Sequence, residues 1–426
     1  MVWLAIICSL AGRLSLIGVK DTTYGVVANL YGKYTLDSHL DVGVGIILKL
    51  GKTPSYPAAY WVGSPVTSLR ELATGDWTDA WLTYRADQCS LRVGRWQANW
   101  GVSPRYSLVL NDTLASRNGL YISWYRSSWR FEYFISFEPP YRVKPDDPVS
   151  SYEVGDRIYR TLVGHRLIVN WRRVELTFAE LAYFTGSGYL ANPMLVNPFI
   201  VWFFLQHTMR PYEWERELNA LWQLSISYKG EFTHLYGELL IDDIQYVNVS
   251  TCEPPQIGYL MGCKSSIKHI ELLIEYTRVY AWTYLGFLPW WRYEAYGYPL
   301  GHPYGPDFDE IFVDIGYRLN DNVSANYNVS YVRKGEPDIH TSWPIKPYGD
   351  WDRFPPGSDF MWGTIEYRTK HAIGISYDSE NWELNLNLGY WRIRNHLHKR
   401  GATLNTPILS LSLIKHFNTS INNPTN

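Results

Sequence analysis

The chain has 426 residues, a formal net charge of -2 and a pI near 6.6, a balance that argues against nucleic acid, because phosphate binding needs clustered lysine and arginine. Aromatic residues make up 16% and hydrophobic residues 46%, yet the mean hydropathy is -0.23. No apolar run reaches the ~18 residues of a spanning helix. Two classes remain: a soluble aromatic-rich protein, and a membrane β-barrel with aromatic girdles at both interfaces.

The first twelve residues form a short apolar segment that ends in small side chains. This resembles the hydrophobic region and cleavage site of a signal peptide, although the basic start is missing, since the first basic residue is Arg13. We therefore predict a signal peptide over residues 1–12 and export of the rest of the chain. The alternatives are a misassigned start and a first β-strand.

The clearest structural signal is a hairpin that turns at residues 229–231. Before the turn, Trp222, Leu224, Ile226 and Tyr228 alternate with polar residues, so the strand has one apolar and one polar face. Similar segments between turn residues recur at 26–34, 40–50, 77–86, 90–96, 120–124, 131–137, 160–170, 174–182, 232–243, 270–276, 311–317, 323–331, 362–378, 382–394 and 407–417. We count about 16 to 18 strands, and an even number is usual for bacterial barrels.

Two features predict that the apolar face points outward into lipid. Charged residues occupy mid-strand positions of the polar face, at Glu271, Glu275, Asp314, Arg318, Glu366, Arg368 and Glu383. Aromatic pairs occupy strand ends, at Trp222 and Tyr228, Tyr327 and Tyr331, and Trp382 and Tyr390, as in interface girdles. Because no composition break divides the series, we predict an all-β fold: one closed antiparallel transmembrane β-barrel over residues 13–417 in the cell outer membrane.

Two segments depart from the alternating pattern. Residues 192–217 contain the best helix candidate, limited by Pro193 and Pro198, and we predict a small helical or plug insertion there. Residues 418–426 form a polar C-terminal tail.

The lengths of the connections predict the orientation of the strands. Counting back from a periplasmic C-terminus places connections 285–309 and 333–358 outside and the turn at Asn320 and Asp321 in the periplasm. Counting forward from the N-terminus with the same loop-length rule gives strand orientations that disagree with the backward count somewhere between residues 183 and 284. Either one strand is miscounted or the barrel has long periplasmic insertions.

Cys252 and Cys263 bracket a Pro-Pro loop, so a disulfide between them would suit an oxidising compartment. Unpaired thiols are the equal alternative. The adjacent carboxylates of Asp242 and Asp243 diverge if they lie in a strand, which favours a pore-lining or capping role over catalysis.

Four blocks resemble, in order, the Wzi family of outer-membrane capsule-assembly proteins. They are 94–96 with 100–101 and 107–112; 164–167 with 174–180; 197–198 with 235–243; and 300–307. The resemblance implies an outer-membrane barrel of about 18 strands with a small helical region. It also implies a non-enzymatic role, in which exported capsular polysaccharide is bound and held at the cell surface. Phe417 would end the signal for the barrel-assembly machinery, although a polar tail follows it.

Two outer connections carry the candidate polysaccharide-binding residues. The first holds Trp290, Trp291, Arg292, Tyr293, Glu294 and Tyr296, and the second holds Trp343, Asp350, Trp351, Asp352 and Arg353. Ring faces cover the apolar C–H surfaces of sugars, while arginine and carboxylates bind hydroxyl and acidic groups. The alternative is that these rings pack the connections onto the barrel mouth or belong to the girdle.

Three functions are therefore open. The first is an outer-membrane barrel, expected to be a monomer in lipid, that binds surface or capsular polysaccharide and helps attach it. The second is a porin-like diffusion channel for small polar solutes, and the third is a soluble carbohydrate-binding β-protein. We expect no enzymatic activity, cofactor or metal.

Overall fold

The computed structural model describes residues 7–19, 23–36, 38–52, 73–112, 116–147, 152–189, 197–208, 218–243, 254–286, 288–343 and 359–420. The strands are β1 Ile7–Val19, β2 Thr23–Thr35, β3 Leu40–Lys52, β4 Ala73–Arg85, β5 Cys89–Trp96, β6 Arg117–Tyr125, β7 Trp129–Arg142, β8 Arg157–Trp171, β9 Val174–Gly186, β10 Leu218–Lys229, β11 Thr233–Asp243, β12 Gln256–Ile267, β13 Ile270–Val279, β14 Glu294–Ala295, β15 Tyr298–Pro299, β16 Phe308–Arg318, β17 Val323–Lys334, β18 Glu366–Asp378, β19 Trp382–Arg394 and β20 Thr403–Ser420. The helical segments are α1 Trp202–Thr208 and the 3₁₀ turns η4 Pro289–Trp291 and η5 His396–His398.

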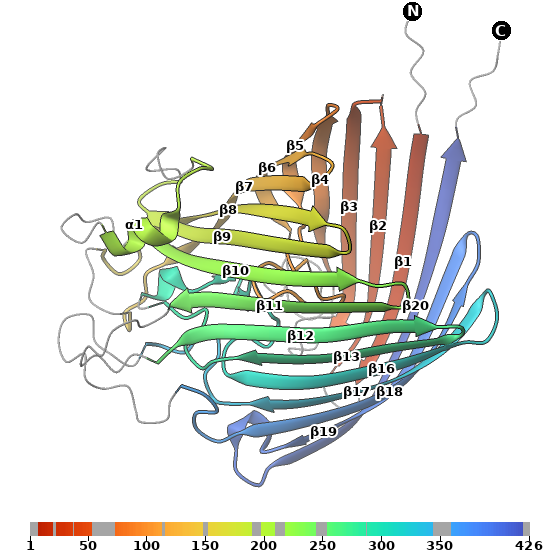
Figure 1. Ribbon diagram of the computed structural model, residues 1–426. Coiled ribbons are helices and arrows are strands. Elements are labelled where there is room, and N and C mark those ends of the chain that lie inside the picture. The colour runs from red at the N-terminus through yellow and green to blue at the C-terminus, as the bar shows by residue number, and fades with distance from the viewer. Residues whose placement is uncertain are drawn as a thin grey trace, which may run out of the picture.

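The main sheet has 18 strands in the described residues, all antiparallel to their neighbours. Each strand pairs with the next along the chain, except that β13 pairs with β16, because β14 and β15 form a separate small hairpin. β20 also pairs with β1, so the first and last strands are neighbours and the sheet forms a ring (Figure 1). The predicted all-β antiparallel architecture is confirmed, and the strand number falls within the predicted range.

The two ends of the ring differ in the length of their connections. The hairpin turns after β2, β4, β6, β8, β10, β12, β16 and β18 are short and lie at the end where Ile7 faces Ser420 and Thr35. Apart from the short link between β1 and β2, the opposite end carries the long connections (Figure 1). The described parts of the predicted connections 285–309 and 333–358 lie at one end, and the 320–321 turn lies at the other, as predicted.

The clash in the forward strand count comes from one strand that the alternating pattern does not reveal. β12 pairs with both β11 and β13 and lies inside the interval where the two counts disagree. Its Leu260 points inward and is 2% exposed, so apolar residues lie on both faces of the strand and alternation is lost. A miscounted strand, rather than long insertions at the short-turn end, explains the discrepancy.

The N-terminal segment differs from the predicted boundary. Ile7–Val19 forms β1, which pairs along its length with β2 and β20, so residues 7–12 belong to the sheet and residues 1–6 lie outside the described part. This agrees with the alternative of a first strand, because β1 covers the edges that β2 and β20 would otherwise expose. At the other end, β20 includes 418–420 of the predicted polar tail.

The two faces of the strands are assigned by side-chain exposure. Leu224 and Ile226 are 45% and 51% exposed on the outer surface, whereas Gln223 and Ser227 on the opposite face are 0% and 2% exposed. The apolar face of the hairpin β10–β11 therefore points away from the ring, as predicted. Apolar exposure on this scale over many strands marks a surface that a second apolar phase covers.

The interior of the ring contains a hydrophobic core, which the predicted polar inner face does not include. Phe134, Leu181, Tyr236 and Leu260 point inward from four strands and pack with apolar residues of two long connections. The charged inner positions predicted from the sequence do face the interior, and Glu275 among them is buried. The inner wall is therefore mixed, with apolar positions where the connections touch it.

The helix predicted within 192–217 is present as α1, which packs against the outer face of β9 and β10 (Figure 1). Phe203 lies 4.3 Å from the Trp222 ring, and Glu180 of β9 accepts the backbone N–H groups of Trp202 and Phe203. The insertion is therefore an external cover at this point. No helix in the described residues is long and apolar enough to cross a membrane.

Candidate functional site

The interior of the ring is occupied by the connection between β5 and β6. Trp100, Leu108, Val109 and Leu110 of this segment are each at most 1% exposed, so they are enclosed within the ring. The described parts of the connection 280–307, residues 280–286 and 288–307, pack against it. We call these residues and residues 97–112 together the lumen plug. The plug contacts the inner wall in the half of the ring that carries the long connections, at Glu238, Glu275 and Glu310.

Arg105 ties the plug to the far wall of the ring. Its guanidinium lies 3.2 Å from a Glu275 oxygen on β13 and 3.0 Å from a Glu310 oxygen on β16. Along the sheet β13 is eight strands from β5, nearly half of the 18-stranded ring, so the segment crosses the interior. Burial by itself would lower the pKa of Arg105, but the two carboxylates outweigh it and raise the pKa above its ordinary value.

The hairpin β10–β11 supplies a second attachment. The Glu238 carboxylate accepts the backbone N–H of Leu108 at 2.7 Å and the Ser107 hydroxyl at 3.2 Å. The Gln223 amide donates to the Trp100 carbonyl at 3.2 Å. The polar inner residues of this hairpin therefore satisfy backbone groups of the plug that would otherwise be buried without partners.

The connection 280–307 forms the other part of the plug. The Tyr293 hydroxyl donates to the Val109 carbonyl at 2.7 Å, and the Asn111 N–H donates to the Leu300 carbonyl at 3.0 Å. Asp242 accepts the Tyr284 N–H at 2.7 Å, which agrees with the predicted capping role of that carboxylate. The two connections thus form one hydrogen-bonded body inside the ring.

Most of the predicted polysaccharide-binding residues of the first connection are buried in this body. Trp290 is 1% exposed and packs between Tyr141 and Tyr152, and Tyr293 is fully buried. Arg292 and Glu294 are buried, with Glu294 paired to Arg160 at 2.7 Å. Burial lowers the pKa of Arg292. For the rings of Trp290 and Tyr293 this burial agrees with the alternative prediction of packing, and Arg292 and Glu294 are buried as well.

Some aromatic rings at the long-connection end are only half-buried. Trp291, Tyr296 and Trp343 among the predicted residues are half-buried, and so are Tyr298, Tyr304 and Trp362. Trp343 and Trp362 contact the buried Trp282 at centroid distances of 5.7 and 5.4 Å. We call six of the half-buried rings at this end the mouth: Trp291, Tyr296, Tyr298, Tyr304, Trp343 and Trp362.

Several predicted positions are not tested by these contacts. Asp350, Trp351, Asp352 and Arg353 lie outside the described residues. Cys263 lies in β12 and Cys252 lies outside the described residues, so the disulfide stays a prediction. Sequence reasoning did not select Tyr304 and Trp362 for the mouth, although Tyr304 falls in the 300–307 block.

Comparison with known proteins shows the fold. No family model and no curated protein matches this chain. Among solved structures, Wzi of Escherichia coli, described as an outer-membrane protein involved in group 1 capsule assembly and a carbohydrate-binding β-barrel, is similar with a TM-score of 0.62 and 12% identity, over 97% of this chain and 85% of that one. OccD3 of Pseudomonas aeruginosa is similar with a TM-score of 0.53 and 12% identity, over 97% and 92%. OccAB4 of Acinetobacter baumannii is similar with a TM-score of 0.51 and 11% identity, over 97% and 98%.

The fold is that of an outer-membrane β-barrel. At identities of 12% or less the similarity shows the fold and no particular activity. The similar structures include both a carbohydrate-binding barrel and Occ proteins.

Proposed function

We propose that this protein is a closed outer-membrane barrel, of the Wzi type, that binds exported capsular or other surface polysaccharide at the mouth and helps attach it to the cell. The observation that carries the proposal is the lumen plug, because Arg105 and Glu238 hold a folded segment across the interior. A segment held across the lumen favours binding at the outer end over passage through it. The role is non-enzymatic, and the partners are polysaccharide, outer-membrane lipid and the barrel-assembly machinery.

The mouth offers the chemistry that polysaccharide binding needs. Half-buried aromatic rings can stack on the apolar faces of sugars while their edges stay fixed by packing. Trp343 and Trp362 are held in this way by Trp282. Rings that are pre-positioned lose little conformational freedom when a ligand binds, which favours affinity.

Deletion of the protein tests the biological role. We expect the deleted strain to make surface polysaccharide but to shed it, as measured by staining of cell-bound and released fractions. Complementation with Trp343→Ala plus Tyr298→Ala should fail to restore retention, whereas Tyr228→Ala, an exposed ring near the short-turn end, should restore it. Full retention in the deleted strain would contradict the proposal.

The second candidate is a porin-like channel, which the likeness to the Occ proteins favours. Single-channel recording in a planar bilayer separates the two candidates. A plugged barrel should show no large steady conductance. Large steady conductance without glycan binding would support the channel and contradict the polysaccharide role.

A further inference from the structure

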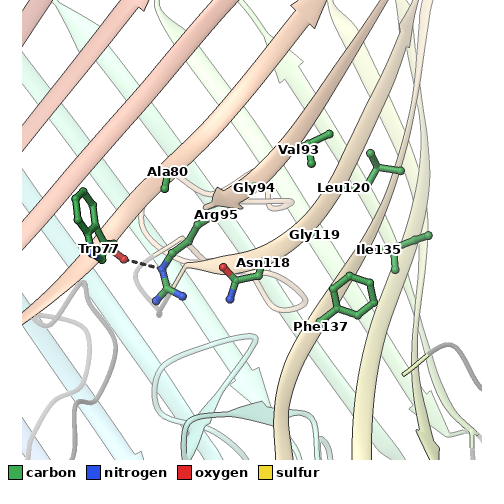
Figure 2. A pocket seen from close by; sticks show the side chains of 10 residues that line it. All are labelled: Trp77, Ala80, Val93, Gly94, Arg95, Asn118, Gly119, Leu120, Ile135 and Phe137. Carbon is green, nitrogen blue, oxygen red and sulfur yellow. Dashed lines mark hydrogen bonds between the residues drawn. The ribbon is translucent and has the colours of Figure 1, made fainter. Parts of the chain in front are cut away.

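A groove of about 870 Å³ lies on the outer face of β4 to β7. Its size falls within the ~300–1,000 Å³ of ligand pockets. It is lined by Trp77, Ala80, Val93, Gly94, Arg95, Asn118, Gly119, Leu120, Ile135 and Phe137 (Figure 2). Val93 and Trp77 are 49% and 53% exposed, and other outward apolar residues of the barrel are exposed in the same way. The groove therefore opens to the surroundings of the barrel and not to its interior.

The groove arises because two strands are shorter than their neighbours. β5 and β6 have 8 and 9 residues, whereas β4 and β7 have 13 and 14. The chain leaves the wall after Trp96 to enter the plug, so β4 and β7 continue past the ends of the ladders at Ala80 and Phe137. The wall therefore has a notch towards the long-connection end.

Two paired glycines form the floor of this notch. A Cβ at Gly94 would lie 2.2 Å from the Ala80 carbonyl oxygen, and one at Gly119 would lie 1.9 Å from that of Ile135. Gly94 also has a backbone φ of +120°, a value that residues with a side chain rarely adopt. The close approach of the neighbouring backbones therefore requires glycine at both positions.

The two polar residues of the lining lie together, on neighbouring strands. Arg95, Asn118 and Phe137 form one row across β5, β6 and β7, and Figure 2 shows Arg95 and Asn118 next to each other. The next outward row towards the short-turn end is entirely apolar: Val93, Leu120 and Ile135. The two polar residues thus lie nearer the long-connection end than the apolar row, with Trp77 and Phe137 on either side of them (Figure 2).

Arg95 is held in position in this groove. Its Nε–H donates to the Trp77 carbonyl at 2.6 Å, on the stretch of β4 that extends beyond the ladder with β5. An outward arginine costs little free energy near a membrane interface but ~2–4 kcal/mol at the midplane. A guanidinium carries a positive charge and five N–H donors in a fork that fits phosphate, so Arg95 places a cation at this point of the groove.

We propose that this groove binds an outer-leaflet lipid, with one acyl chain along the row of Val93, Leu120 and Ile135 and a phosphate of its headgroup at Arg95 and Asn118. The charge of the lining and the order of its residues identify the occupant. A cationic side chain near the membrane interface, followed by a row of apolar side chains, matches an anionic amphiphile. This rests on the outer-membrane location of the barrel and not on polysaccharide binding.

Native mass spectrometry of the full chain in detergent tests the proposal, with diphosphoryl lipid A and the same lipid A with its phosphates removed as probes. We expect the phosphorylated lipid to bind better, and Arg95→Gln to reduce its binding about tenfold. Val93→Trp should block both lipids by filling the groove. Arg157→Gln, which removes an exposed arginine at the same end of the barrel but outside the groove, should bind as the wild type does.

Heat-modifiable migration on a gel shows that each variant is folded, so loss of binding is separated from loss of the barrel. Equal binding of the two lipids, or unchanged binding by folded Arg95→Gln, would overturn the proposal. A lipid-free dimer that Val93→Trp converts to a monomer would also overturn it, because the occupant would then be a second copy of the chain.

Discussion

Adjacent residues of one strand face two different surroundings in this protein. On β19, Leu386 lies beside Ile375 and Leu411 in the ladder, whereas the next residue, Asn387, lies beside Gly374 and Ser410. Leu388 on the same face as Leu386 is 55% exposed, so this face points outward. The change in the free energy of unfolding that a substitution causes should therefore depend mainly on whether the residue faces outward or inward, and less on its depth in the membrane.

A charge placed on either face of β19 tests this dependence. Leu386→Arg should lower the free energy of unfolding in lipid vesicles by ~2–4 kcal/mol, because the guanidinium would enter hydrocarbon. Asn387→Arg should be tolerated, because the inner face is polar there. Urea unfolding followed by tryptophan fluorescence measures both, and equal losses would mean that the two faces are wrongly assigned.

His302 of the plug is buried among rings. Phe308 stacks on it at 4.5 Å, and Tyr106 and Tyr304 lie at 5.0 and 5.4 Å. Burial lowers its pKa from 6.5 to about 3; Glu310 opposes this shift and Arg105 adds to it. The imidazole is therefore neutral in the folded protein at neutral pH, and its protonation destabilises the folded plug.

This depressed pKa predicts acid sensitivity. Below pH 6.5 the unfolded chain binds a proton that the folded chain does not, so stability falls with falling pH until about pH 3. By pH 4 the loss from this group should be about 3 kcal/mol. His302→Gln should flatten the unfolding curve between pH 6.5 and 4, whereas His39→Gln, in an exposed turn, should not. Identical curves for wild type and His302→Gln would contradict this assignment.

At the scale of elements, α1 covers a carboxylate that faces outward from the barrel. Glu180 is fully buried, and it accepts the Trp202 and Phe203 N–H groups and the Trp222 indole N–H at 2.7–3.0 Å. His165 lies 3.2 Å from the same carboxylate. A helix of seven residues gains little from its own hydrogen bonds, so these contacts hold it against the barrel.

Glu180→Ala should therefore release α1 without opening the barrel. We expect hydrogen exchange at residues 202–208 to become at least about tenfold faster, because hydrogen bonds to a charged group contribute ~1.5–3 kcal/mol. Glu175→Ala, on the same strand but facing the interior, should leave this exchange unchanged. Unchanged exchange in Glu180→Ala would show that apolar packing alone holds the helix.

The plug depends on Arg105 in a comparable way. Arg105→Met would leave Glu275 and Glu310 buried without their cation, a loss of ~3–5 kcal/mol. The barrel should stay folded while the plug opens, so planar-bilayer recordings should show new conductance. Arg318→Met, which removes a 58%-exposed arginine from the short-turn end, should stay closed. A silent Arg105→Met variant would show that the other contacts suffice to hold the plug.

For the whole molecule, alternation alone predicted most of the strands, the outward apolar face and the end that carries the long connections. It failed at β12, because the plug makes the inner face apolar at Leu260. It also could not distinguish the buried Tyr293 from the half-buried Tyr296, because the burial of Tyr293 depends on Val109, which is 184 residues away in the chain. Contacts between distant connections, which leave no local pattern, determine which rings form the mouth.

Binding of the host strain's purified surface polysaccharide to the detergent-purified chain tests the proposed function most directly. Biolayer interferometry should show saturable binding that falls about tenfold when Trp343 and Tyr298 are both replaced by alanine. Tyr228→Ala should leave that binding unchanged. Absence of saturable binding by the folded wild-type chain, or equal binding by the double variant, would contradict the account.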